Sequence, residues 1–360
     1  MKTKKKLRIA FISPKRYSFY PPDYLGRGLG GSESSLILMS RALAKRGHHI
    51  DVYNCCYRPG VYDGVNWLPL WQYQNDNYDV AISLRLLETF DQDIKAPIRG
   101  LWIHDETLKG ATEADQRGLV NLWIAVSETQ KKFIERKEFI DPEHWFVSRN
   151  GLDVAIYEEL KNNSKIPGQV IYCSAPDRGL SFLLDYWSDI VSKVPFAKLI
   201  ITGSWSLWGN ADEENGRFFE ELYQKAKSLP RVELLKRVSK KRLAQLQSQS
   251  QLMMYPTVFN EMFCISALEC MAVGTPVISN SRAAMSERIV SGVDGVLISG
   301  EPGELKFREE LIATTVALLR DEKSLGRLSV NAITSTLSSS HNDIAEEWEM
   351  EFINRLNKNI

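Results

Sequence analysis

Two glutamates, Glu261 and Glu269, mark the stretch of this chain where residue type and spacing suggest chemistry. Glu261 lies in a loop after an apolar run that ends at Tyr255, and Glu269 lies early in a helix predicted from about Cys264 to Val273. The start of a helix offers unpaired N–H groups and the positive end of its dipole, which together bind a diphosphate. A carboxylate near such a site repels phosphate and instead accepts hydrogen bonds from neutral hydroxyls. The pattern therefore predicts a nucleotide-sugar ligand.

The residues around the two glutamates predict a strand, a loop, a helix and a second strand. The run from Leu252 to Tyr255 is typical of a buried parallel strand. Gly274 suits the position after a helix, Pro276 cannot continue the helix, and Val277 begins the next strand. The helix start is therefore expected at the carboxyl edge of a parallel sheet, where ligands of such sheets bind.

Glu261 and Glu269, followed by Ala-Val-Gly-Thr-Pro-Val-Ile at 272–278, resemble the donor-site signature of the GT-B retaining glycosyltransferases of family four, the glycosyl transferases group 1. The resemblance implies that Glu261 lies by the transferred sugar and that Glu269 holds the ribose. This family usually has glycine on both sides of the Phe, and this chain has larger residues there. The resemblance also assigns donor binding to the end of the loop and the start of the helix, at Met262, Phe263, Cys264 and Ile265.

The first part of the chain carries a second glycine-rich segment. Residues 7–13 predict a strand, residues 14–31 a long loop rich in tyrosine and glycine, and Ser32 a cap for a helix that ends at Gly47. The segment from His49 to Asn54 is predicted as the second strand. This order of elements opens a doubly wound α/β domain, whose ligands bind beyond the carboxyl ends of the strands.

The glycines of this loop fit two interpretations. Gly26, Gly28 and Gly31 have the spacing of the dinucleotide fingerprint, and Asp51 follows where its ribose-binding acid would stand. In that fingerprint the first glycine directly follows the strand, whereas here about a dozen residues intervene and Asp51 falls inside a predicted strand. We therefore favour a flexible, aromatic-rich active-site loop. Gly30 and Gly31, followed by Ser and Glu, also resemble the first glycine loop of many family-four enzymes and are expected at the donor.

Two further positions complete the predicted site. His104 ends a strand predicted at 100–104, and the resemblance implies that it contacts the donor sugar, with Asp105 as a positioning neighbour. Arg178 lies in a turn after another predicted strand, where a cation would offset the charge that develops on a departing diphosphate. Relatives usually have a second cation shortly before this turn. The chain lacks it there, so Lys236 and Arg237 are the candidates to replace it.

Composition limits the class of protein. A chain of 360 residues favours two domains, because single cores rarely grow beyond about 250–300 residues. Its 45 basic residues balance 45 acidic ones, which argues against nucleic acid as a main partner. The 5 cysteines lack Cys-x-x-Cys spacing and suggest reduced thiols. The histidines are scattered and Asp91-x-Asp93 is interpreted as a solvated loop, so no metal is predicted.

Targeting signals are also missing from the sequence pattern. No apolar run reaches the roughly 18 residues that a membrane span needs. The lysines at positions 2, 4, 5 and 6 predict a solvated tail. We therefore expect a cytoplasmic protein with at most a weak peripheral contact at the inner face of a membrane.

Together these features predict a GT-B fold of two doubly wound Rossmann-like domains that face a central cleft. The expected parts are an acceptor-side domain at 1–160, a linker at 161–168, a donor domain at 169–335, and a final helix at 336–360 that crosses back to the first domain. The predicted reaction moves a sugar from a nucleotide diphosphate sugar, the co-substrate, to a hydroxyl of a glycan, lipid-linked glycan or small molecule. Retention at the anomeric carbon and independence of metals and cofactors are expected. The alternatives are an NAD-dependent oxidoreductase and a non-catalytic nucleotide- or glycan-binding module.

Overall fold

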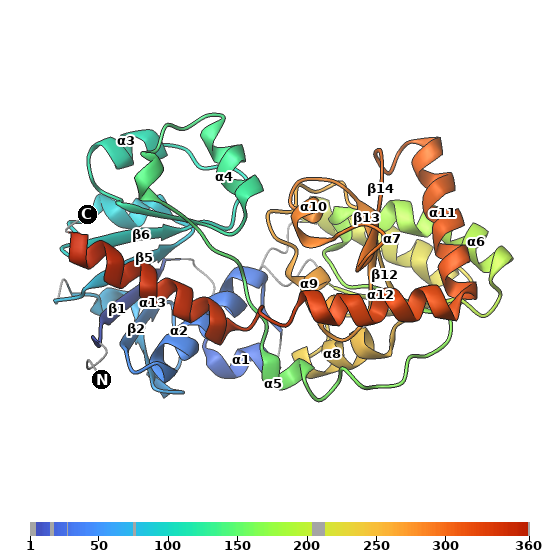
Figure 1. Cartoon of the computed structure of the whole chain (residues 1–360), viewed down its shortest axis with the longest axis horizontal. Helices are drawn as coiled ribbons and strands as arrows, with labels where there is room; N and C mark the ends of the chain where they lie inside the picture. Colours follow the sequence, from blue (N-terminus) through green and yellow to red (C-terminus); the bar gives the residue numbers. More distant parts are fainter. Residues whose placement is uncertain (1–4, 15–17, 27, 75–76, 204–212, 359–360) are drawn as a thin grey trace. The chain divides into compact units, whose positions relative to one another are not determined.

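A computed structural model describes residues 5–14, 18–26, 28–74, 77–203 and 213–358, so the lysines at positions 2 and 4 lie outside it. The chain divides into two compact units. The first comprises Met1–Tyr24, Leu29–Gly151 and Ser339–Ile360, and the second comprises Leu25–Gly28 and Leu152–Ser338. The sequence placed the first boundary at residue 160, whereas residues 152–160 group with the second unit. Each unit has its own sheet with helices against it (Figure 1).

The first unit is built on an eight-stranded sheet with the order β3-β4-β2-β1-β5-β6-β7-β8. Its neighbouring strands are parallel, except that β3 runs antiparallel to β4. The sequence analysis did not anticipate β3 and β4, which are short and carry few buried apolar residues. The strands are β1 (Arg8–Ser13), β2 (His49–Asn54), β3 (Gly60–Tyr62), β4 (Val65–Pro69), β5 (Val80–Leu84), β6 (Ile98–Trp102), β7 (Leu122–Ala125) and β8 (Trp145–Val147).

The predicted loop at 14–31 contains a helix. This helix is α1 (Pro21–Gly26), and Phe19, Tyr20 and Tyr24 around it are buried, so the prediction of a flexible, aromatic-rich loop is wrong for these residues. Their apolar rings gain more from packing than from solvent exposure. The remaining helices of the unit are α2 (Gly31–Lys45), η1 (Leu70–Gln72), η2 (Leu87–Asp91), α3 (Ala111–Gln116), α4 (Glu128–Glu135), η3 (Pro142–His144) and α13 (His341–Lys358).

The helix α13 supplies a central part of the core of the first unit, and it packs beside α2 (Figure 1). Trp348 is fully buried, its ring lies 4.8 Å from that of Trp102, and its Nε1–H donates to Ser148 Oγ at 2.7 Å. Farther along α13, Arg355 donates to the main-chain oxygens of Asn121 and Glu143 at 3.1 and 2.9 Å. The helix is therefore joined to the sheet by both apolar and polar contacts.

The second unit has a six-stranded, fully parallel sheet with the order β11-β10-β9-β12-β13-β14. Its central strands β9, β12 and β13 are fully buried, as expected where helices cover both faces of a parallel sheet, whereas the edge strand β11 is only half-buried. The strands are β9 (Gln169–Tyr172), β10 (Lys198–Thr202), β11 (Val232–Lys236), β12 (Leu252–Tyr255), β13 (Val277–Asn280) and β14 (Gly295–Ile298).

In the second unit α6 lies against α7 and α11, α9 lies against α8 and α12, and α11 also contacts α12. The sequence analysis missed α12, whose many Ser, Thr and Asn residues and internal Gly326 weaken the helical signal. The helices are α5 (Val154–Tyr157), η4 (Pro176–Arg178), α6 (Leu180–Lys193), α7 (Glu213–Ser228), α8 (Lys240–Gln249), α9 (Ile265–Ala272), α10 (Met285–Arg288), α11 (Leu305–Arg320) and α12 (Glu322–Ser335).

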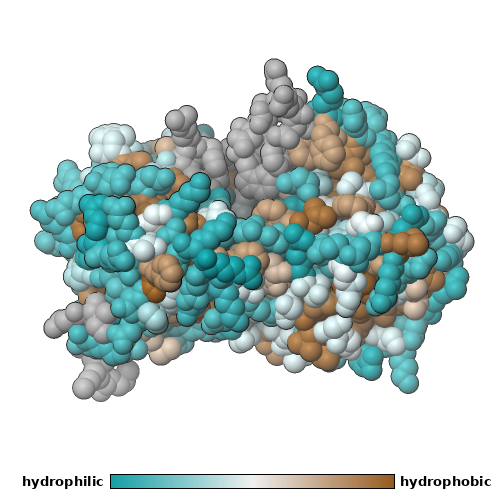
Figure 2. Space-filling model, turned by 90° about the horizontal axis from the view of Figure 1, so that it is seen from above, coloured by the Kyte–Doolittle hydropathy of each residue, from teal (hydrophilic) through white to brown (hydrophobic). Residues whose placement is uncertain are grey.

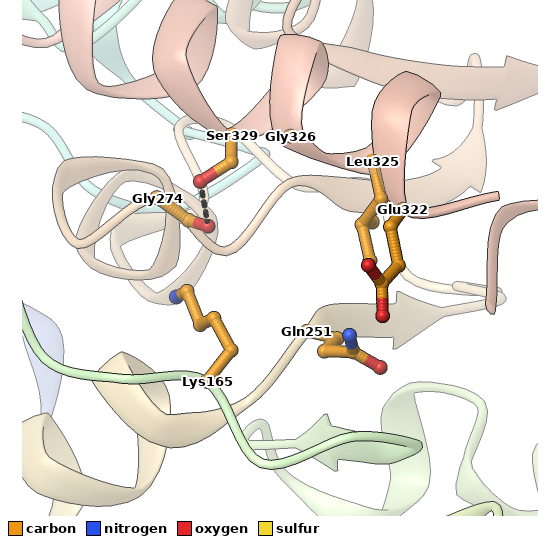
Figure 3. Close-up of a pocket in the computed structure, with 7 residues that line it drawn as sticks. All are labelled: Lys165, Gln251, Gly274, Glu322, Leu325, Gly326 and Ser329. Atoms are coloured by element: carbon orange, nitrogen blue, oxygen red, sulfur yellow. Dashed lines mark hydrogen bonds between the residues drawn. The ribbon is translucent and has the colours of Figure 1, made fainter.

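A cavity of about 200 Å³ lies between α12 and the start of the second unit (Figure 3). Lys165 lies at its edge, and its Nζ donates to the carbonyl of Val273 at 2.8 Å and to Thr275 Oγ1 at 2.6 Å. Burial lowers the pKa of Lys165 to about 8. The cavity is lined by Lys165, Gln251, Gly274, Glu322, Leu325, Gly326 and Ser329.

This lowered pKa makes stability depend on pH in a defined window. In the unfolded chain Lys165 has its ordinary pKa of 10.5, so between about pH 8 and 10.5 the unfolded state binds more protons than the folded state. The contribution of Lys165 to the free energy of unfolding therefore increases as the pH rises through the window. Urea unfolding of the wild type and Lys165→Met at pH 7.5 and 9.5 should show the wild type gaining on the order of 1 kcal/mol relative to the variant. A difference that does not change with pH would contradict this.

The surface offers no sign of a membrane-spanning element. None of the helices in the described ranges is long and apolar enough to cross a bilayer. On the face drawn in Figure 2, hydrophilic residues predominate and hydrophobic residues form small separate groups.

Candidate active site

The loop at residues 256–263, which we call the Glu261 loop, connects β12 to α9 and is fixed from several sides. Asn280, the last residue of β13, exchanges two hydrogen bonds of 3.0 Å with the main chain of Thr257. The main-chain N–H of Ala284 donates to the carbonyl of Glu261 at 2.9 Å. Both partners come from the neighbouring strand and the turn after it, so the sheet itself sets the position of the loop.

A glycine turn lies against the same loop. Gly179 follows η4 and has a φ of +123°, and a Cβ built there would come 1.9 Å from the carbonyl oxygen of Pro256. Only glycine allows both this backbone conformation and this close approach. The contact brings the preceding residue, Arg178, to the Glu261 loop.

The half-buried Arg178 and the buried Glu261 form an ion pair. Arg178 Nη1 donates to Glu261 Oε1 at 2.9 Å, the hydroxyl of Tyr255 donates to the same oxygen, and the guanidinium carbon lies 4.1 Å from the ring centroid of Phe259. Burial opposes the charge on Arg178, but Glu261 outweighs it and the pKa of Arg178 lies above its ordinary value. Burial, followed by the Glu261 charge, raises the pKa of Tyr255, which therefore stays protonated and donates. The structure thus brings together two predicted site residues, Arg178 and Glu261.

The residues at the start of α9 are buried or half-buried. Met262, Phe263 and Cys264 are buried, and Ile265, the first residue of the helix, is half-buried. Cys264 is the N-cap and makes no side-chain capping hydrogen bond. The amides of this first turn therefore have no side-chain cap from Cys264, and their binding of a diphosphate stays a prediction.

Cys264 also explains why the related family favours glycine here. Its φ of +61° and ψ of 74° lie in the left-handed region, which glycine adopts without steric cost. Burial, and after it the charge of Glu261, raises the pKa of the Cys264 thiol, so this side chain stays neutral. Cys264 therefore adopts a left-handed conformation that favours glycine, the residue type that the resembled family usually has there.

Substitutions at Cys264 should separate backbone strain from side-chain packing. Cys264→Gly removes the cost of the left-handed conformation but loses buried contacts, so its free energy of unfolding should remain within about 1 kcal/mol of the wild type. Cys264→Val places a β-branched residue at the same φ and should lose at least about 2 kcal/mol. Urea unfolding measures both. Equal stability of the two variants would show that the strain has been misjudged.

Glu269 occupies a second polar cluster. Its Oε1 pairs with Lys240 Nζ, and its Oε2 accepts a hydrogen bond from Gln247 Nε2 at 3.2 Å. The hydroxyl of Tyr157 donates to Gln247 Oε1 at 3.3 Å. Glu269 and Gln247 are buried, and Lys240 is only 11% exposed at its side chain. Lys240, Gln247 and Tyr157 were not predicted as site residues.

The predicted residues of the first unit lie at or near the carboxyl ends of its strands. β6 ends at Trp102, two residues earlier than predicted, and the ring of His104 lies 4.9 Å from that of Trp102. Asp105 accepts two hydrogen bonds from Arg85, a residue with a φ of +71° directly after β5. Asp105 therefore has Arg85 as its charged partner, a contact that the sequence analysis did not foresee.

In the glycine-rich segment, the structure shows where α2 begins and which side chains contact Gly28 and Ser32. Helix α2 begins at Gly31 with Gly30 as its N-cap, so the prediction that Ser32 caps the helix is wrong. Ser32 instead accepts a hydrogen bond of 3.5 Å from Arg85 Nη1. Arg237, the candidate second cation, donates to the carbonyl of Gly28 at 2.5 Å.

The dinucleotide fingerprint is not formed. Gly26 is the last residue of α1 rather than the turn after β1, which ends at Ser13. Asp51 is buried within β2, where it accepts hydrogen bonds from Tyr78 and Asn66 at 2.6 Å each. Asp51 is the third residue of β2 rather than a residue at the carboxyl end of the strand, where the ribose-binding acid of the fingerprint stands, so the structure gives no support to the NAD-dependent alternative.

No group of three or more His, Cys, Asp or Glu residues among those described could hold a metal ion. Asp91 and Asp93 are exposed, in agreement with their interpretation as a solvated loop.

Part of the chain matches a known protein family, and the whole chain is similar in structure to solved proteins. Residues 168–321 match the family described as glycosyl transferases group 1. Sucrose-phosphate synthase from Thermosynechococcus elongatus has a TM-score of 0.76 and 15% identity, over 98% of this chain and 100% of that one. HepE of Anabaena, solved in complex with UDP and glucose, has a TM-score of 0.72 and 17% identity, over 97% and 100%.

A third similar structure is WaaG, a glycosyltransferase involved in lipopolysaccharide biosynthesis, with a TM-score of 0.66 and 14% identity over 96% of this chain and 99% of that one. None of the curated proteins compared with the chain matches it. The predicted fold class is confirmed: this chain has the GT-B fold of these structures, and its residues 168–321 match the model of the glycosyl transferases group 1.

Proposed function

We propose that this protein transfers a sugar from a nucleotide diphosphate sugar to an acceptor hydroxyl, with retention at the anomeric carbon and without a metal ion. The observation that carries the proposal is the Glu261 loop and the start of α9, where a partly buried Arg178–Glu261 pair adjoins a helix N-terminus without a side-chain cap. The amides of α9 and Arg178 would bind the diphosphate, and Glu261 and Glu269 would bind hydroxyls. HepE, which shares the fold, binds UDP and UDP-glucose, which supports a donor of this class.

The position of Glu261 favours a binding role over a nucleophilic one. Its Oε1 already accepts from Arg178 and Tyr255, and its Oε2 is the oxygen that a sugar hydroxyl would use. A carboxylate held by a cation and a hydroxyl is a weak nucleophile. In the proposed reaction the departing phosphate takes the proton of the acceptor, and His104 contacts the donor sugar.

Arg178 would replace a metal ion in this scheme. Negative charge develops on the diphosphate as the sugar leaves, and a fixed cation stabilises it more than the ground state. Activity that persists in a chelator would support this part of the proposal. We propose that the acceptor is a glycan, a lipid-linked glycan or a small molecule. Candidates from these classes are tested as acceptors in the activity assay. The protein is proposed to act in the cytoplasm, with at most a peripheral contact at a membrane.

The donor class is tested by thermal shift with UDP, GDP, ADP, dTDP, their sugar forms and NAD, on the wild type, Glu269→Ala and Glu309→Ala. A ligand that binds the folded state raises the unfolding midpoint according to its concentration over its Kd. We expect one nucleotide series to stabilise the wild type and to lose most of its effect in Glu269→Ala. Glu309 is exposed on α11. Glu309→Ala removes the same charge outside the candidate site and should therefore behave as the wild type.

The two rival functions give different results in this panel. Stabilisation by NAD alone would favour the oxidoreductase, and tight nucleotide binding without turnover would favour a binding module. For an active donor, the anomeric configuration of the product, followed by NMR from the start of the reaction, shows retention or inversion.

The role of Arg178 is tested by Arg178→Gln. Loss of one charge-stabilising donor in a site shielded from water costs about a hundredfold in kcat. We expect a fall of that order with a donor KM that changes less, because the charge that Arg178 offsets develops in the transition state. The unfolding midpoint of the free variant checks that loss of the Glu261 partner has not unfolded the loop. A kcat within threefold of the wild type, on the order of 0.7 kcal/mol, would remove Arg178 from the mechanism.

A further inference from the structure

The cluster around Glu269 contains three residues that no motif identifies. Lys240 is the first residue of α8, Gln247 lies two turns farther along the same helix, and Tyr157 ends α5. Residues seven apart on a helix share a face, so Lys240 and Gln247 approach Glu269 from the same side. Both oxygens of the carboxylate are engaged, Oε1 by Lys240 and Oε2 by Gln247.

Each member of this cluster is oriented by another. Glu269 can only accept, so Gln247 must present its Nε2–H to it, and the hydroxyl of Tyr157 donates to the Oε1 on the other side of the same amide. Lys240 Nζ also lies 5.6 Å from the ring centroid of Tyr157, within the range of a cation–π contact. The carboxylate of Glu269 is therefore contacted by Lys240 and Gln247 of α8, and Tyr157 of α5 contacts both of these side chains.

The two engaged oxygens retain capacity for a ligand. An ionised carboxylate has about four lone-pair sites, and Lys240 and Gln247 use one on each oxygen. One site on each oxygen is then left, which matches the two adjacent hydroxyls of a ribose. A buried carboxylate without such partners would be costly to keep charged.

We propose that Lys240 is a positioning residue that, with Gln247 and Tyr157, fixes Glu269 as a two-point acceptor for the vicinal hydroxyls of a ribonucleotide, and that the site thereby discriminates against 2′-deoxyribonucleotides. This inference rests on the proposed function and deepens it by naming the class of donor. The donors are then sugars carried by nucleoside diphosphates that contain ribose. The dTDP-sugars contain 2′-deoxyribose and are poor donors.

The test measures Kd by calorimetry for UDP, GDP and ADP and for their 2′-deoxy counterparts. The wild type should bind one ribonucleotide at least tenfold more tightly than its 2′-deoxy form. Lys240→Met should weaken that ribonucleotide about tenfold, in line with the loss of a charge-assisted hydrogen bond that orients the acceptor, and should reduce the 2′-deoxy discrimination. Lys240→Arg, which keeps the charge, should restore part of the affinity.

Two further variants isolate the route of the effect. If Lys240 acts through Glu269, then adding Lys240→Met to Glu269→Gln should cause little further loss, because coupled residues do not add. Lys241 is the next residue of α8 and is exposed, so Lys241→Met removes the same charge from the same turn and should leave both Kd values within twofold. For turnover, Lys240→Met should raise the donor KM more than it lowers kcat.

The outcomes separate this inference from the function on which it rests. A wild type that binds none of the nucleotides overturns both. A wild type that binds a ribonucleotide, with Lys240→Met binding it equally well or more tightly, overturns only the inference and makes Lys240 a bystander or a competitor of the ligand. Equal weakening of the ribose and 2′-deoxy forms, with additive losses in the double variant, would assign Lys240 a purely structural role.

Discussion

The close approach of Gly179 to the carbonyl of Pro256 is the constraint on which the candidate site depends. The turn after β9 and the loop after β12 leave neighbouring parallel strands, and no side chain fits between them. Their backbones therefore pass near van der Waals contact, and Arg178 meets Glu261 as a consequence. The ion pair is thus a product of strand order, because the same two residues on strands farther apart would not touch.

Two separate polar clusters follow from this sheet edge. The cluster of Arg178, Glu261 and Tyr255 lies before α9, and the cluster of Lys240, Gln247 and Glu269 lies along it. Buried charges in each are paired, as the low polarity of a protein interior requires. The carboxyl edge of a parallel sheet is where the loops allow ligands to reach such polar groups.

The sequence predicted the second unit in more detail than the first for physical reasons. Its strands are continuous apolar runs, and Gly274, with a φ of +67°, ends α9 as its type implies. The prediction for the segment around Phe19 and Tyr24 was wrong because aromatic residues and glycines occur both in flexible loops and in packed turns. Residue type alone therefore does not distinguish the two. Partners that meet only through the fold, such as Arg85 with Asp105 or Lys240 with Glu269, carry no local signal, since their spacing along the chain is arbitrary.

The division of the chain has a consequence for the order in which the two units fold. Residues 152–338 form most of the second unit as one uninterrupted segment, whereas the first unit needs Trp348 of α13, which comes later in the chain than that whole segment. During synthesis the second sheet can therefore assemble while the first still lacks a fully buried side chain of its core. Until α13 emerges, the apolar surface around Phe11 and Trp102 stays open to solvent, and this is the interval in which the nascent chain is most exposed to aggregation.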